Sequence, residues 1–64
     1  MRAIELHNTT EEAIDVLNAL QEGYRKNTGE NTTMLVDFIG RMINGLANSL
    51  TWIEGQERIE AEAQ

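Results

Sequence analysis

The pattern of apolar and polar positions after residue 32 predicts one long helix with a wide apolar face. At about 100° per residue, the apolar side chains fill roughly half of the circumference. They are Leu35, Val36, Phe38, Ile39, Met42, Ile43, Leu46, Ala47, Leu50 and Ile53. We expect this helix over residues 33–54. An acidic tail over residues 55–64, either frayed or helical, follows it.

A thinner apolar stripe precedes it and predicts a first amphipathic helix over residues 9–26. Its members recur at steps of four, three and four residues: Ala13, Leu17, Leu20 and Tyr24. Thr9, followed three residues later by Glu12, matches a capping box and marks the expected start. The polar run after Lys26 contains Gly29, which predicts a loop over residues 27–32.

The N-terminal residues 1–8 alternate with a period of two. Ile4 and Leu6 lie on one side, and Ala3, Glu5 and His7 lie on the other. This alternation predicts an extended arm or a short strand. A lone strand must pair to be stable, most simply with its copy in a dimer.

The two helices differ in the apolar surface they offer, because the thin stripe of the first cannot cover the wide face of the second. A chain of 64 residues without cysteine has a marginal core of its own. The predicted fold is therefore all-α: a single domain over residues 1–64, a helical hairpin that assembles as a homo-oligomeric bundle. The predicted oligomer interface is Leu35, Ile39, Met42, Ile43, Leu46, Leu50 and Ile53.

One flank of the second helix is a candidate binding groove. Met34 and Trp52 share nearly the same azimuth there, with the small residues Gly45 and Ser49 between them and Phe38 at the edge. Small residues between large apolar ones let another helix or a ligand approach closely. Met34, Phe38 and Trp52 are the predicted partner-binding residues. In the alternative interpretation, Met34 and Trp52 only cap the core at the helix ends.

The charge balance narrows the class of partner. The formal net charge is -6, and neither half of the chain is basic. Nucleic-acid binding depends on Lys and Arg at phosphates, so a protein with a basic surface is the more natural partner. The sequence has no apolar run typical of a signal peptide or a membrane span, which predicts a cytoplasmic protein without membrane contact.

Catalytic chemistry is not indicated. The chain has one histidine, His7, and one serine, Ser49, remote from it in sequence, and no metal-ligand or phosphate-loop motif. We therefore expect no enzyme activity, metal or cofactor. The best small-ligand candidate is an anion site at Tyr24, Arg25 and Lys26, where subunits could hold a nucleotide between them. The alternative is that these cations complement the helix dipole.

The order of elements also resembles the ribbon-helix-helix repressors, in which a short strand precedes two helices joined by a glycine-containing turn. Ile4 and Leu6 would face the core, and residues 28–31 resemble the turn. The resemblance implies paired strands in the DNA major groove. The sequence departs from it in an acidic exposed strand face and a longer loop.

The function predicted from the sequence is that of a small acidic, non-enzymatic interaction protein. We expect an adaptor or inhibitor that self-associates and binds another macromolecule. A ribbon-helix-helix-like DNA-binding regulator and an oligomer that binds a small anion at subunit interfaces are the alternatives.

Overall fold

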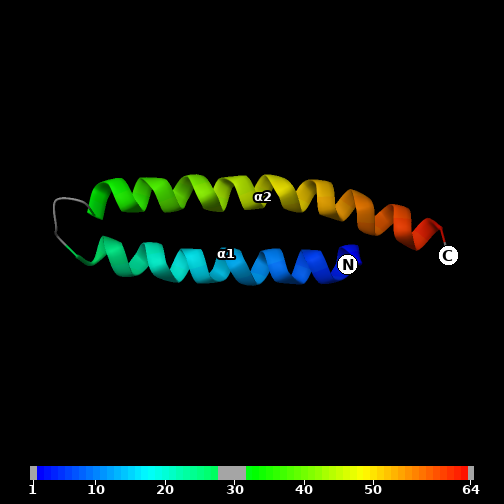
Figure 1. The fold of residues 1–64 in the computed structure, drawn as a ribbon, viewed down its shortest axis with the longest axis horizontal. Coiled ribbons are helices and arrows are strands. Elements are labelled where there is room, and N and C mark those ends of the chain that lie inside the picture. The colour runs from blue at the N-terminus through cyan, green and yellow to red at the C-terminus, as the bar shows by residue number, and fades with distance from the viewer. Residues whose placement is uncertain (1, 28–31, 64) are drawn as a thin grey trace.

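The computed structural model describes residues 2–27 and 32–63, which form two antiparallel helices lying side by side (Figure 1). Helix α1 spans Ala3–Arg25 and helix α2 spans Thr32–Glu62. The molecule measures 52 × 14 × 13 Å along its principal axes. Because its described residues form two helices side by side (Figure 1), it is a single layer two helices wide. The predicted all-α hairpin is confirmed. No strand occurs in the two described segments.

The helices meet along one seam of residues spaced by alternating steps of three and four. This spacing keeps a stripe on one side of a helix, as in coiled coils. On α1 the seam is Ala3, His7, Thr10, Ile14, Leu17, Gln21 and Tyr24, and on α2 it is Thr32, Val36, Ile39, Ile43, Leu46, Leu50, Ile53 and Glu57. All of these residues are buried or half-buried.

The core that this seam encloses is thin. Among the described residues, only Ala3, Ile39 and Ile53 are buried apolar side chains, and Thr10 is buried beside them. The chain exposes 4951 Å², whereas a compact monomer of this mass exposes roughly 4100 Å². A single layer of two helices leaves the rest of its apolar surface uncovered.

Helix α1 begins at Ala3, six residues before the start predicted at Thr9, so residues 3–8 of the predicted extended arm are helical. Arg2 provides no side-chain cap. The backbone N–H of Ala3 instead donates to both carboxylate oxygens of Glu60, at 3.3 and 3.2 Å. A carboxylate at a helix N-terminus satisfies free N–H groups and complements the dipole. Glu60 thus caps α1 from the other helix.

Helix α2 continues to Glu62. Of the two predicted alternatives for the acidic tail, frayed or helical, the structure has the helical one up to that residue. Its last turns extend past the N-terminal end of α1 (Figure 1). Glu57 and Glu60 lie in this part and contact α1. These contacts explain why a segment with little apolar character remains helical. Within residues 2–27 and 32–63, neither helix combines the length and apolar character needed to cross a bilayer.

Nearer the loop, a side-chain amide joins the helices. Gln21 Nε2 donates to the backbone carbonyl of Val36 at 3.1 Å. Gly40 lies next to this amide: a Cβ at Gly40 would stand 3.2 Å from Gln21 Nε2. The missing side chain at Gly40 therefore leaves the space through which Gln21 reaches the backbone of α2.

At the open end of the hairpin, His7 lies between two carboxylates. Its Nδ1 contacts Glu57 of α2, and its Nε2 contacts Glu11 one turn further along α1. The hydrogen bond with Glu57 raises the pKa of His7 above its ordinary 6.5, although partial burial acts against it. The charge of Glu57 and the contact with Glu11 add to the increase.

Replacing helical glycines should separate open positions from close contacts. Gly55→Ala should raise the free energy of unfolding by about 0.5–1 kcal/mol, because glycine disfavours helix and a Cβ there meets no atom within 4 Å. Gly40→Ala should raise the free energy of unfolding by less than Gly55→Ala does, or lower it, because the added Cβ would lie too close to the Gln21 side chain. Urea unfolding followed by circular dichroism measures both. An equal gain at the two positions would contradict the close approach at Gly40.

The stability of the hairpin should depend on pH through His7. Because folding raises the pKa of His7, its contribution is fully present below pH 6.5 and is lost as the pH rises through the folded-state pKa. The free energy of unfolding, measured at fixed protein concentration, should therefore fall above pH 6.5. His7→Gln should flatten this fall, and Glu57→Gln should flatten it more than Glu11→Gln. An unchanged pH profile in His7→Gln would contradict the role of this cluster.

Candidate functional site

One broad side of the hairpin is uncharged along most of its length, and Glu60 borders it only at the open end. We call it the uncharged face and define it by the positions that directly precede the seam positions, together with Ile59, which precedes Glu60 one turn after the end of the seam. These are Leu6, Thr9, Ala13, Val16, Leu20 and Gly23 on α1, and Leu35, Phe38, Met42, Gly45, Ser49, Trp52, Gln56 and Ile59 on α2. Because the helices are antiparallel and both right-handed, these positions lie on the same side of the layer.

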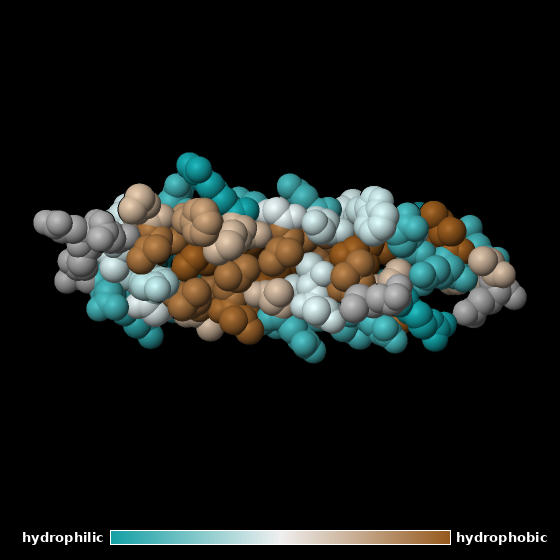
Figure 2. Space-filling model, viewed as in Figure 1, coloured by the Kyte–Doolittle hydropathy of each residue, from teal (hydrophilic) through white to brown (hydrophobic). Residues whose placement is uncertain are grey.

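The uncharged face carries most of the large apolar side chains that the hairpin exposes. Their exposed fractions are 66% for Val16, 46% for Leu20, 58% for Phe38, 36% for Met42, 63% for Trp52 and 58% for Ile59. Met34, 66% exposed, lies one turn before Phe38 at the edge of this face. Figure 2 shows this side of the molecule, with apolar surface running across both helices and densest toward the loop.

The other broad side and the outer edges hold the charged residues of the helices. Their carboxylates include Glu11, Asp15, Glu22, Asp37 and Glu54, all exposed. Two cations pair locally: Arg41 with Asp37 at 3.2 Å, and Arg25 with Glu22 at 3.9 Å. Such exposed pairs contribute little to stability. The hairpin thus separates an apolar side from a charged, mainly acidic side.

The structure divides the residues predicted as an oligomer interface. Ile39 and Ile53 are buried, and Ile43, Leu46 and Leu50 are half-buried, in the seam against α1. Leu35 and Met42 lie on the uncharged face. The apolar arc of α2 therefore has two parts, one packed within the hairpin and one open.

The residues predicted to bind a partner are all exposed. Phe38 and Trp52 lie on the uncharged face, with Gly45 and Ser49 between them, and Met34 lies at its edge. Trp52 also lines a hollow of about 200 Å³ with Ala3, Leu6, Gln56 and Glu60. This hollow places Leu6 of α1 and Trp52 of α2 on the same side.

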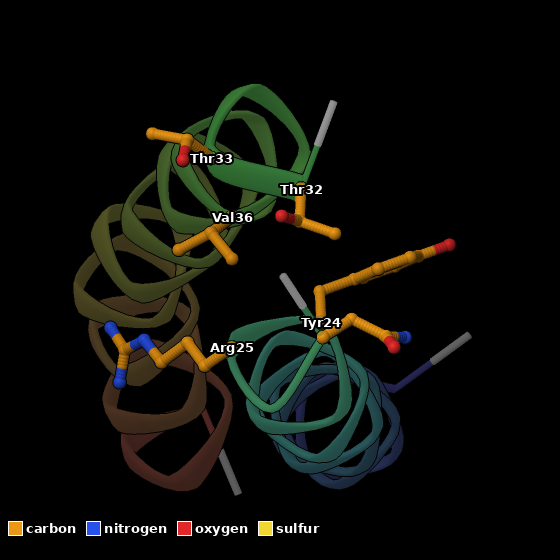
Figure 3. A pocket seen from close by; sticks show the side chains of 6 residues that line it. Tyr24, Arg25, Thr32, Thr33 and Val36 are labelled. Carbon is orange, nitrogen blue, oxygen red and sulfur yellow. The ribbon is translucent and has the colours of Figure 1, made fainter. Parts of the chain in front are cut away.

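The predicted anion site lies at the loop end of the hairpin. Tyr24 and Arg25 line a pocket of about 210 Å³ with Asn27, Thr32, Thr33 and Val36, whereas Lys26 does not line it. The Tyr24 ring and the Arg25 side chain point toward opposite sides of the pocket (Figure 3). The cationic groups therefore do not converge on one point.

Three of the exposed large apolar side chains on the uncharged face are not among the predicted site residues: Val16, Leu20 and Ile59. Leu20 belongs to the apolar stripe predicted for the first helix. Their spacing is the signal that identifies them: Val16 and Leu20 each directly precede a seam position, and Ile59 lies seven residues after Trp52 of the same face. Ile4, 48% exposed, belongs to the opposite side, where it lines a hollow with Arg2, Glu57, Glu60 and Ala61.

Among the described residues, no group of three or more histidine or carboxylate side chains is arranged to hold a metal ion. No family model matches this chain, and comparisons with curated proteins and with solved structures give no match.

Proposed function

We propose that this chain is a small non-enzymatic interaction protein, an adaptor or inhibitor, in which each side of an amphipathic hairpin has its own role. The uncharged face mediates self-association. The acidic side binds a protein with a basic surface.

The observation that carries this proposal is the exposure of six large apolar side chains on a face without charge. The largest apolar patch on a typical monomer covers about 300–600 Å², and larger patches mark interaction sites. The interacting surface spans both helices rather than lying in one groove of α2 (Figure 2). This breadth favours a macromolecule over a small ligand.

The distribution of charge supports the same division. With a net charge of -6, two copies repel each other when acidic surfaces meet. Contact through the uncharged face keeps the carboxylates in water and on the outside. There they can attract a basic partner and orient it during association.

The two alternative functions lose support. The resemblance to ribbon-helix-helix repressors depended on a strand containing Ile4 and Leu6, and this segment is the first turn of α1. A nucleotide site depended on converging cations, and Arg25 is already paired with Glu22 while Lys26 lies outside the pocket. Neither is proposed.

Self-association should fail when a charge is placed on the uncharged face. Light scattering after size exclusion should give a multiple of the 7.2 kDa chain mass for the wild type. Phe38→Glu should weaken association roughly 30-fold, or about 2 kcal/mol, because a carboxylate would be buried. The control Asn44→Glu adds the same charge on the opposite side and should not change the mass. A folded wild-type monomer at 100 µM would contradict this role of the face.

Binding of a partner should depend on the exposed carboxylates. We expect the immobilised protein to capture a basic protein from its native host, with binding that weakens as salt screens the exposed charges. Neutralising the outer residues by Glu12→Gln and Asp15→Asn should lower the recovery of that protein. The Phe38→Glu variant separates this binding from self-association. Recovery that is insensitive to both salt and neutralisation would count against an acidic binding side.

A further inference from the structure

We propose that a second copy of this chain covers the uncharged face, with a two-fold axis that crosses α2 at Gly45 and α1 near Val16. The α2 helices would then pack antiparallel on each other, and so would the α1 helices. The product is a four-helix bundle of two stacked hairpins. This inference rests on the proposed self-association and specifies its geometry.

The area of the face fits a dimer. Seven large apolar side chains, counting Met34, are about one third to two thirds exposed. At roughly 100 Å² each they offer on the order of 700 Å², close to the ~800 Å² per partner of a standard interface. The absence of charge within the helices on this side removes the repulsion that two acidic copies meet elsewhere.

Gly45, like Gly23 and Gly55, has no explanation within one hairpin, and of the three it is the one in the middle of the uncharged face of α2. It lies in the middle of α2, where glycine disfavours the helix, and a Cβ there meets no atom within 4 Å. Gly40, by contrast, accommodates Gln21. A glycine facing open space on an apolar side allows another helix to approach closely.

The side chains around Gly45 are suited to contact with their own copy. Phe38 and Trp52 stand seven residues before and after Gly45, so an antiparallel α2 pair centred there places Phe38 of each copy against Trp52 of the other. The same register places Met42 near Ser49 of the second copy. Ser49 Oγ donates to the Gly45 carbonyl at 3.1 Å, so its hydroxyl can be buried without losing its partner.

The register of the hairpin makes both helices agree on one axis. The contacts between the helices bracket the level of Gly45 on α1. Ala3 with Glu60 and His7 with Glu57 would place Gly45 opposite residues 18–19, and Gln21 with Val36 and with Gly40 would place it opposite residues 12–16. The middle of this range is Val16. A two-fold axis at this level therefore sets Val16 against its own copy, and Ala13 near Leu20 of the second copy.

Single cysteines test this geometry cleanly, because the chain contains none. At the axis, Gly45→Cys should form a disulfide-linked dimer at least about tenfold faster than Ser49→Cys, because disulfides need nearby Cα atoms. Ser49 lies on the same face but is offset from its copy by about 12 Å along the helix axes in this register. Asn44→Cys, on the opposite side, should not cross-link. Circular dichroism of the reduced variants checks their folding.

Trp52 gives a second test in the unmodified protein, since it is the only tryptophan. Its emission should shift to shorter wavelength as concentration drives dimer formation. A monomer in light scattering would overturn both this inference and the proposed self-association. A dimer in which Ser49→Cys cross-links as fast as Gly45→Cys, or in which Trp52 emission stays constant, would overturn the geometry alone and leave the proposed function standing.

Discussion

The antiparallel seam between α1 and α2 is the constraint on which the rest of the structure depends. Isolated helices are marginal in water, and most helical stability in proteins comes from packing against a neighbour. The seam takes one side chain every three or four residues from each helix. A seam of this spacing covers only one stripe of side chains on each helix, so the neighbouring stripes stay exposed to solvent. The uncharged face consists of the stripe beside the seam on each helix.

Polar residues in the seam set its register. Ile39 and Ile53 are buried in the seam. Apolar contacts of this kind are not directional, so they alone would let one helix slide along the other. Gln21 bonds to the Val36 carbonyl near the loop, and Ala3 and His7 bond to Glu60 and Glu57 at the open end. These contacts are directional and occur at both ends. They align the two helices, and with them the two halves of the uncharged face.

The sequence predicts much of this arrangement, and the remainder has identifiable causes. The wide apolar arc of α2 identifies the helix, but periodicity alone does not divide the arc between seam and open face, because Ile39 and Phe38 are adjacent in sequence. The start of α1 at Ala3 could not be predicted from neighbouring residues, because the residue that caps it, Glu60, lies 57 positions away in the sequence. Local rules locate caps among neighbouring residues, so Thr9 and Glu12 matched a motif that the longer helix contains in its interior.

The thin core and the open apolar face are two aspects of the same shape. A single layer encloses little, and the side chains it leaves outside are those that a second layer would bury. Under the proposed pairing, α2 gains a neighbour on the side of Phe38 and Trp52, and the buried core becomes continuous across four helices. Folding and association would then be linked, because anything that binds only the folded chain stabilises it. A dimeric hairpin would therefore be more stable at higher protein concentration, and Gly45 would weaken the isolated helix at the point where the assembled one needs space.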